Sequence, residues 1–490
     1  MARFNHKSLT DDELDYLFEG VSFKIAPRRH QAISISFALD NADSRVVFLH
    51  GVGTGKTLSS LFTAQLWKCK KILVVCPSLA FSAWERDIPL GTNYSYTFLI
   101  GSKKERLKEL KKEMDISIIN FEGLKSIYCK LIKKKKGVGK EWKIASTFLD
   151  NFDCIIFDEV HRCNNYKSLQ TKICYELSKR ANYVIGMTGT AVDKSMLELF
   201  NMYKTVDLGR SLGTNFFIYR TTHFHPGWYD WLLNKGAKEK ILSAISGNSI
   251  SFEREECFDL PDLQTISLPV PASKEFCDLQ EQVINNESVN VKDIELGEFD
   301  IKAKANFLRE LSGGFFYYDI DGQKYSYHLK SNPKLDAVRD VIQDSDCKVL
   351  VFYWYKEEKV LIEEMLKKNK IKFVSIYGGQ DHVERKDIVK SFSSDSNIRV
   401  MTAQSRISEG YDASTAQIAM FYLPLGSPRM RTQCIGRIYR SGQKKKCIIY
   451  DVVLKNSVDG NIIVDRGERF NLVNSVKKYI QEYNQESSEV

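Results

Sequence analysis

Three short motifs in this chain carry the residue types that handle phosphate groups. GVGTGKT (Gly51–Thr57) combines glycines with a Lys-Thr ending, and DEVH (Asp158–His161) places two carboxylates side by side. Much further along, Arg437 and Arg440 stand three residues apart in QCIGRIYRSGQ, on an expected helix. Backbone amides, a lysine, Mg²⁺-binding carboxylates and an arginine supplied from outside are the parts that phosphoryl transfer uses. The motifs, in this order, predict phosphoryl transfer in a protein of two lobes.

The glycine-rich motif is expected to cradle a nucleotide. It follows an apolar run that ends at about Leu49 and precedes the helical run LSSLFTAQLW. Strand, loop and helix in this order direct backbone amides and a positive helix terminus at phosphates. Lys56 would bind the β and γ phosphates of ATP, and Thr57 would ligate Mg²⁺. The strict pattern has Gly where His50 stands, and a chance glycine-rich turn is the alternative. The expected nucleotide contacts are Gly51, Gly53, Thr54, Gly55, Lys56 and Thr57.

The carboxylate pair follows the apolar run CIIF. Ligands of open α/β sheets bind at the carboxyl ends of the strands. Asp158 is therefore expected to hold Mg²⁺, and Glu159 to orient the attacking water. The alternative is a purely structural pair, which would be costly to bury without a metal or hydrogen-bond donors.

The arginine pair has two interpretations. Arg437 and Arg440 could be solvated residues paired with local carboxylates. Alternatively, they reach the γ-phosphate from the other lobe and so link the ATP state to lobe closure. The two preceding motifs favour the second interpretation, which makes both arginines catalytic.

Short apolar runs separated by helical stretches must position these motifs. Near-continuous apolar strands between helices are typical of parallel sheets covered on both faces. The first series is 46–51, 72–77, 116–120, 154–159 and 183–190, and the second is 348–354, 373–379, 398–403, 418–424 and 447–453. The sequence therefore predicts an α/β protein with two tandem doubly wound sheets.

The remaining segments give the domain organisation. A capping box at Thr10–Glu13 predicts an N-terminal helix, and DLPDLQ (259–264) is a plausible hinge. The expected domains are a lead-in (1–24), a first lobe (25–262) with a helical insertion (195–258), and a second lobe (263–490) with a helical insertion (272–335) and a polar tail (480–490). The lysine-rich segment 131–143 is either a solvated loop or a phosphate contact. Aromatic groups at 315–318 and at Trp228 and Trp231 are either core or stacking platforms for bases.

Composition supports a nucleic-acid partner without requiring one. The formal charge is +9, which fits a phosphate backbone as well as a merely basic protein. The 11 cysteines are scattered without a CxxC pair, which argues against zinc and a disulfide framework. No segment has the length of a signal peptide or a membrane span. We expect a soluble, intracellular protein without a membrane partner, in the cytoplasm of a prokaryote or phage-infected cell.

With these motifs the chain resembles the helicase superfamily 2 ATPases, and most of all the SWI/SNF-type DNA translocases, over about residues 25–455. The resemblance implies two RecA-like lobes that use ATP and Mg²⁺. It assigns adenine recognition to Gln31, nucleic-acid contacts to Ser78, Trp84, Asn120, Thr402 and Arg406, interlobe nucleotide contacts to Gly410, Asp412 and Gln433, and coupling to His161, Thr188 and Thr190. RSGQ (440–443) is similar to the ending of the SWI/SNF-like group. Ala191 in place of Pro and Gly436 in place of Asp depart from that group's pattern.

The resemblance implies a motor that translocates on DNA, mostly duplex, and remodels DNA or protein–DNA complexes. Single-stranded DNA or RNA is an alternative track, and a strand-separating helicase is an alternative activity, favoured by Gly436. A non-catalytic DNA-binding or transcription accessory factor is a third reading, against which the intact Lys56, Asp158, Glu159 and Arg437 argue. The compact chain would be a monomer without DNA, take its targeting from a protein partner, and suit a phage or other virus.

Overall fold

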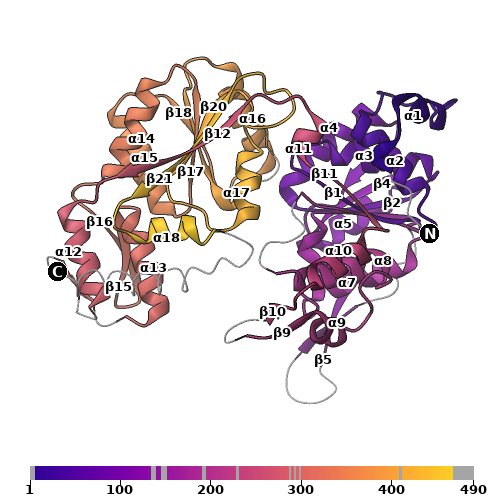
Figure 1. The fold of residues 1–490 in the computed structure, drawn as a ribbon, viewed down its shortest axis with the longest axis horizontal. Helices are drawn as coiled ribbons and strands as arrows, with labels where there is room; N and C mark the ends of the chain where they lie inside the picture. Colours follow the sequence, from indigo (N-terminus) through magenta and orange to yellow (C-terminus); the bar gives the residue numbers. More distant parts are fainter. Residues whose placement is uncertain are drawn as a thin grey trace. The chain divides into compact units, whose positions relative to one another are not determined.

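The computed structural model describes residues 6–133, 140–144, 152–189, 195–227, 231–285, 289–291, 294–296, 299–407 and 411–466. The chain divides into two compact units, Met1–Asp259 and Leu260–Val490. Each unit holds one large sheet with helices on both faces (Figure 1). No helix in the described ranges combines the length and the apolar character needed to cross a membrane.

The sheet of the first unit has seven parallel strands in the order β11-β1-β8-β7-β2-β4-β3. Its strands are β1 (Arg45–His50), β2 (Ile72–Cys76), β3 (Tyr96–Phe98), β4 (Ile116–Asn120), β7 (Cys154–Asp158), β8 (Tyr183–Met187) and β11 (Ser249–Phe252). Its helices are α1 (Asp11–Leu17), α2 (Arg29–Leu39), α3 (Lys56–Leu66), α4 (Phe81–Gly91), α5 (Lys103–Leu110), α6 (Phe121–Tyr128), α7 (Leu169–Arg180), α8 (Leu197–Asp207), α9 (Phe216–His223), α10 (Ala237–Ile245) and α11 (Arg254–Cys257).

The sheet of the second unit has six parallel strands in the order β12-β21-β20-β17-β19-β18. Its strands are β12 (Leu263–Val270), β17 (Lys348–Tyr353), β18 (Phe373–Ile376), β19 (Val400–Gln404), β20 (Ala416–Phe421) and β21 (Cys447–Leu454). Its helices are α12 (Lys274–Ile284), α13 (Ile301–Ser312), α14 (Pro333–Asp344), α15 (Lys356–Lys368), α16 (His382–Ser394), α17 (Pro428–Ile435) and α18 (Val458–Val464).

Alternate strand residues enter separate cores, because successive side chains point to opposite faces. In β1, Val47 joins one core while Val46 and Phe48 join the other. In β17, Val349 and Val351 face one core, and Leu350 and Phe352 face the other. Both sheets are therefore buried on two sides, which confirms the predicted pair of doubly wound α/β lobes.

Three segments differ from the expectation. The insertions are not only helical, since they include the antiparallel pairs β9 (Phe224–Pro226) with β10 (Trp231–Leu233), β13 (Val289–Val291) with β14 (Ile294–Leu296), and β15 (Phe315–Ile320) with β16 (Gln323–His328). The ends of the lysine-rich segment are strands too, β5 (Cys129–Lys133) and β6 (Lys140–Ile144), and the residues between them lie outside the described part. The expected hinge DLPDLQ runs into β12 at Leu263.

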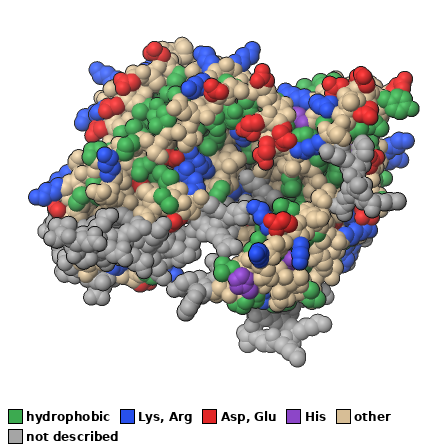
Figure 2. Space-filling model, in the orientation of Figure 1, with side chains coloured by type: hydrophobic (Ala, Val, Ile, Leu, Met, Phe, Trp, Pro, Cys, Tyr) green, Lys and Arg blue, Asp and Glu red, His purple; other side chains and the backbone are tan. Residues whose placement is uncertain are grey.

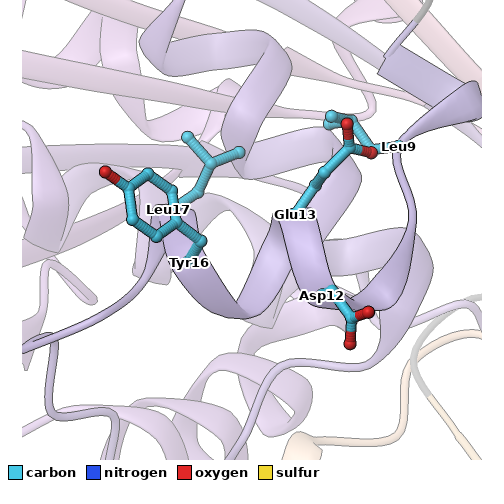
Figure 3. Close-up of a pocket in the computed structure, with 5 residues that line it drawn as sticks. All are labelled: Leu9, Asp12, Glu13, Tyr16 and Leu17. Atoms are coloured by element: carbon cyan, nitrogen blue, oxygen red, sulfur yellow. The ribbon is translucent and has the colours of Figure 1, made fainter.

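The predicted N-terminal helix is α1, and its capping box between Thr10 and Glu13 is present. Leu14 is its buried residue, whereas Tyr16 is 78% exposed. Together with Leu9, Asp12, Glu13 and Leu17, Tyr16 lines a shallow, mostly apolar hollow (Figure 3). The predicted polar tail (480–490) lies outside the described residues.

Candidate active site

The glycine-rich loop joins the end of β1 to the start of α3, as the motif requires. Gly53 has φ 85° and Gly55 has φ 82°, which is the left-handed region that glycine enters without strain. A Cβ on Gly55 would also lie 2.7 Å from Gln31 Nε2. The loop conformation therefore depends on glycine at this position for two separate reasons.

The Lys56 amino group lies over the loop. Nζ donates to His50 O at 2.9 Å and to Gly51 O at 3.1 Å. The Thr54 hydroxyl also donates to Gly51 O, at 2.8 Å, and Thr57 is half-buried in the first turn of α3. A positive charge, a hydroxyl and the amino end of a helix thus meet at one loop, which is the arrangement that binds phosphate.

His50 replaces the glycine of the strict pattern without disturbing the loop. Its side chain is fully buried and stacks on Phe48 with a centroid distance of 5.3 Å. Nε2 lies 3.1 Å from the Ser34 hydroxyl. Burial, together with the charges of Lys56 and His30, lowers the pKa of His50 well below its usual value. The imidazole is therefore a neutral core group, and only the carbonyl of His50 takes part in the loop.

Three side chains outside the motif hold the loop backbone. His30 Nε2 lies 2.8 Å from Thr54 O, and Gln31 Nε2 donates to Gly55 O at 3.1 Å. Arg254 of α11 donates through Nε to Val52 O at 2.9 Å. Sequence reasoning assigned Gln31 to adenine and missed His30 and Arg254. No local signal marks Arg254, which is 202 residues from its partner.

The two carboxylates lie at the end of β7, Asp158 as its last residue and Glu159 directly after it, and have different surroundings. Asp158 Oδ2 accepts a hydrogen bond from Trp84 Nε1 at 3.0 Å. Trp84 is fully buried in α4, so the prediction that it contacts nucleic acid is wrong for this conformation, because no solvent-facing atom remains. Glu159 has φ 58°, a conformation that costs a non-glycine residue energy and is often found at functional sites.

Glu159 forms a hydrogen-bonded group with His161 and Thr188. Its Oε2 lies 3.1 Å from His161 Nδ1 and accepts from the Thr188 hydroxyl at 3.3 Å, and His161 Nδ1 and Thr188 Oγ1 are 2.9 Å apart. Burial raises the pKa of Glu159, but the His161 hydrogen bond and charge, Lys56 and Thr188 together lower it below its usual value. The carboxylate therefore stays ionised at neutral pH. The third expected coupling residue, Thr190, lies outside the described residues.

The end of β8 brings the carboxylate group and the loop together. A Cβ on Gly189 would lie 3.4 Å from Lys56 Nζ and 2.9 Å from Val52 Cγ2. Among the described residues no cluster of three or more metal-ligating side chains occurs. Mg²⁺ commonly takes one or two carboxylates, with substrate phosphates and water completing its shell. The hydroxyl of Thr57 and the carboxylate of Asp158 fit that pattern.

The arginine pair lies beyond a helix rather than on it. The helix α17 ends at Ile435, and Gly436 caps it, so the expectation that the pair lies on a helix is wrong. Arg437 is 8% exposed and donates to Gln433 O at 3.1 Å and Tyr411 O at 2.9 Å. Arg440 Nε lies 3.5 Å from Asp412 Oδ2, and its NH1 donates to Tyr411 O at 3.5 Å. Both guanidinium groups therefore converge on one carbonyl of the second unit.

The neighbouring residues of the arginine pair include two glutamines, Gln433 and Gln443. Gln433 is 8% exposed, and Gly410 lies outside the described residues. Gln443, the last residue of RSGQ, donates through Nε2 to Ser414 O at 2.9 Å, Ala416 O at 3.0 Å and Ile438 O at 3.1 Å. The glutamine of this motif therefore fixes the local backbone.

Comparisons with known proteins agree with this arrangement. Residues 24–193 match the family model for the type III restriction enzyme res subunit, and residues 333–442 match the helicase conserved C-terminal domain. A Caenorhabditis elegans relative, the SWI/SNF-related matrix-associated actin-dependent regulator of chromatin subfamily A-like protein 1 homolog, is 24% identical over 88% of this chain. The chain is therefore similar to the helicase superfamily 2 ATPases of the SWI/SNF type.

Two further matches have comparable sequence identity to this chain. The uncharacterized ATP-dependent helicase YqhH of Bacillus subtilis is 21% identical over 92% of this chain and 79% of its own length. A solved Sulfolobus solfataricus SWI2/SNF2 ATPase core in complex with dsDNA is 18% identical over 90% of each chain, with a TM-score of 0.42. The chain spans 59% of the length of the nematode relative.

The expected nucleic-acid contacts of this chain differ in exposure. Ser78 and Arg406 are exposed, and Asn120 is half-buried with Oδ1 accepting from Arg106 at 3.2 Å. Thr402 is fully buried and donates to Ser375 Oγ at 2.9 Å. The prediction of a direct contact by Thr402 is therefore wrong for this conformation, because its hydroxyl is used inside the second unit.

The aromatic groups are mostly structural. Phe315 and Phe316 are fully buried, which confirms the core interpretation for these two. Trp231 is half-buried, and the Arg220 guanidinium lies 4.1 Å from its ring centroid. Trp228 lies outside the described residues.

Proposed function

We propose that this chain is an ATP-dependent nucleic-acid motor that translocates on DNA, mostly duplex, and remodels DNA or protein–DNA complexes. One observation carries the proposal: the phosphate loop, Asp158 and the Glu159 group meet at the carboxyl end of one parallel sheet. Gly189 lies directly beside the lysine of the loop, since a Cβ added to it would lie 3.4 Å from Lys56 Nζ. Ligands of open α/β sheets bind at that end.

Each residue of the first unit has a distinct role in the proposed reaction. Lys56 exchanges its bonds to His50 O and Gly51 O for the β and γ phosphates of ATP. Thr57 and Asp158 hold Mg²⁺, which neutralises developing charge when bound. Glu159, kept ionised by its neighbours, orients the attacking water. The adenine assignment of Gln31 stays part of the proposal, although its amide already supports Gly55 O.

The second unit would complete the reaction. Arg437 and Arg440 stabilise charge on the γ-phosphate, and Gly410, Asp412 and Gln433 contribute to the nucleotide contacts. An arginine from outside the nucleotide-binding lobe is worth about 10³–10⁵ in rate. His161, Thr188 and Thr190 couple hydrolysis to movement of the lobes, which we assign to residues 25–262 and 263–490.

The proposed track is the phosphate backbone of DNA. Ser78, Asn120 and Arg406 contact it, and the net charge of +9 favours it. On the face shown in Figure 2, Lys and Arg side chains are interspersed with Asp and Glu over both units. The name of the nematode relative, a regulator of chromatin, supports a remodelling role. A protein partner would supply targeting, and the chain would be monomeric without DNA.

ATP hydrolysis with and without nucleic acid tests the proposal. Phosphate release is measured with duplex DNA, forked DNA, single-stranded DNA and RNA, for the native protein, Lys56→Ala and the control Lys103→Ala. Lys103 is exposed at the start of α5, so its removal leaves the site unchanged. We expect stimulation, strongest with duplex DNA, that Lys56→Ala abolishes and Lys103→Ala retains. Hydrolysis of the native protein no faster than that of Lys56→Ala would overturn the proposal.

A strand-separating helicase is the second candidate. The observation in its favour is Gly436, which stands where SWI/SNF-type proteins resembling this chain carry Asp. Strand displacement and triplex displacement are measured on matched substrates. Unwinding without triplex displacement assigns the helicase activity, and the reverse result assigns duplex translocation.

A further inference from the structure

A cavity of about 260 Å³ lies in the second unit, and neither Arg437 nor Arg440 lines it. Four segments contribute to it: α13, the turn after β17, the short helix η5 (Ser405–Ile407), and the start of α17. The lining residues are Asn306, Arg309, Trp354, Tyr355, Arg406, Leu425, Gly426, Ser427 and Met430. A water molecule takes about 30 Å³ in the liquid, so a phosphate group with associated water fits.

Arg309 is the unusual residue of this cavity. It is 4% exposed, and its NH2 donates to Pro424 O at 3.3 Å. Its Nε has no hydrogen-bond partner. A buried donor on a charged group is costly when it is left unpaired, and a bound water molecule or ion is one explanation for such a donor in a native structure.

The surroundings of Arg309 add positive charge. The guanidinium groups of Arg309 and Arg406 lie 5.2 Å and 4.2 Å from the Trp354 ring centroid. Among the described residues that line the cavity, none carries a carboxylate. The carboxyl group of the nearby Glu358 offsets this positive charge only in part, because burial raises its pKa to about 7.

The start of α17 also faces the cavity. Ser427 caps this eight-residue helix and accepts from Met430 N at 3.3 Å. The positive end of a helix favours anions. A buried arginine with an unused donor, an exposed arginine and a helix start therefore surround one small space.

We propose that this cavity binds one phosphate group, with Arg309 and Arg406 as its ligands. The inference deepens the proposed function, on which it rests, because a nucleic-acid motor presents two sources of phosphate. One is a phosphodiester of the DNA backbone, and the other is a phosphate of a nucleotide. Arg309 belongs to none of the motifs that predicted nucleic-acid contacts.

Duplex-DNA binding without ATP tests the site, by fluorescence anisotropy at a series of salt concentrations. The variants are Arg309→Gln, Arg406→Gln and the double variant, with Arg339→Gln as the control. Arg339 pairs with Asp336 and Asp340 on α14, outside the cavity. Each duplex phosphate contact contributes about 0.9 to the slope of log K against log salt. We expect each single variant to lower the slope by about one, and the double variant by no more than either single change, because one phosphate is lost.

Binding of a fluorescent ATP analogue to the same variants distinguishes the sources. Unchanged analogue binding with a reduced salt slope assigns the site to DNA, whereas weaker analogue binding with an unchanged slope assigns it to a nucleotide phosphate. Circular dichroism checks the fold of the Arg309 variant, and the exposed Arg406 keeps the test decisive if that variant unfolds. If Arg406→Gln and every folded variant match Arg339→Gln in both assays, the inference is wrong. That outcome is distinct from failure of the proposed function, which would appear as absence of DNA-stimulated hydrolysis.

Discussion

Trp84→Phe removes one hydrogen bond from the proposed magnesium ligand. The indole of Trp84 is fully buried and donates to Asp158 Oδ2 at 3.0 Å. Phenylalanine keeps an aromatic ring in the core but has no donor. The substitution therefore changes the orientation of Asp158 while leaving its charge in place.

The size of the effect follows from the charged acceptor. A hydrogen bond to a charged group is worth about 1.5–3 kcal/mol, and about 1.4 kcal/mol corresponds to a factor of ten. Partners that orient metal ligands commonly change metal affinity by about 10–100-fold. We expect the Mg²⁺ concentration for half-maximal ATP hydrolysis to rise by about tenfold or more.

The assay is ATP hydrolysis at saturating ATP and DNA over a series of Mg²⁺ concentrations. Trp67→Phe is the matched control, because Trp67 is 9% exposed in a core of the same unit and stacks on Tyr183 at 5.1 Å. Both variants lose part of a buried indole, so both lose some thermal stability. Only Trp84→Phe should alter the Mg²⁺ dependence.

Two results would refute this reasoning. Equal Mg²⁺ dependence of the two variants would mean that the Trp84–Asp158 bond does not orient a metal ligand. A loss of DNA affinity by Trp84→Phe alone, with unchanged Mg²⁺ dependence, would restore the nucleic-acid role that the sequence indicated.

Two further predictions concern backbone conformation and pH. Gly55→Ala should weaken binding of an ATP analogue by at least tenfold, because a Cβ there meets Gln31 Nε2 at 2.7 Å and φ is 82°. The control Gly20→Ala has a similar φ of 76° but no neighbour within 4 Å, so it should lose some stability through backbone strain and keep its affinity for the analogue. Equal binding by both variants would contradict this prediction. The native protein should lose thermal stability between about pH 5 and 7, because burial raises the pKa of Glu358 from 4.5 to about 7 and the folded state binds more protons than the unfolded state over that interval. The loss for this fully buried group is on the order of 3 kcal/mol, and Glu358→Gln should show a flatter pH dependence of the melting temperature.

The sequence predicted the central strands well because their burial leaves a plain signal. All five residues of β2 (ILVVC) are buried, and a strand covered on both faces needs such an apolar run. The edge strands β11 and β12 were missed. β12 is largely exposed and contains Pro269, a composition that only an edge strand tolerates. Nothing in its local pattern separates it from a loop.

The site was predictable where function depends on local spacing. The loop Gly51–Thr57 and the carboxylates Asp158 and Glu159 lie where their motifs indicated. The partners that orient them come from tertiary contacts and could not be read locally. Trp84 is 74 residues from Asp158, and its motif indicated a surface role. The end of α17 before Arg437 was missed for a related reason, since Gly436 marked a family pattern in the sequence and caps the helix in the structure.

Arg254 has a consequence for dividing this chain into fragments. The last strand of the first sheet, β11, ends at Phe252, and a cut there would keep every strand of the unit. It would also remove the guanidinium that donates to Val52 O, so the fragment would have a complete sheet and a phosphate loop that lacks one of its three supporting side chains. A fragment intended for nucleotide binding should continue to Asp259, where the first compact unit ends. The segment that leads to the second sheet thus carries part of the loop's support.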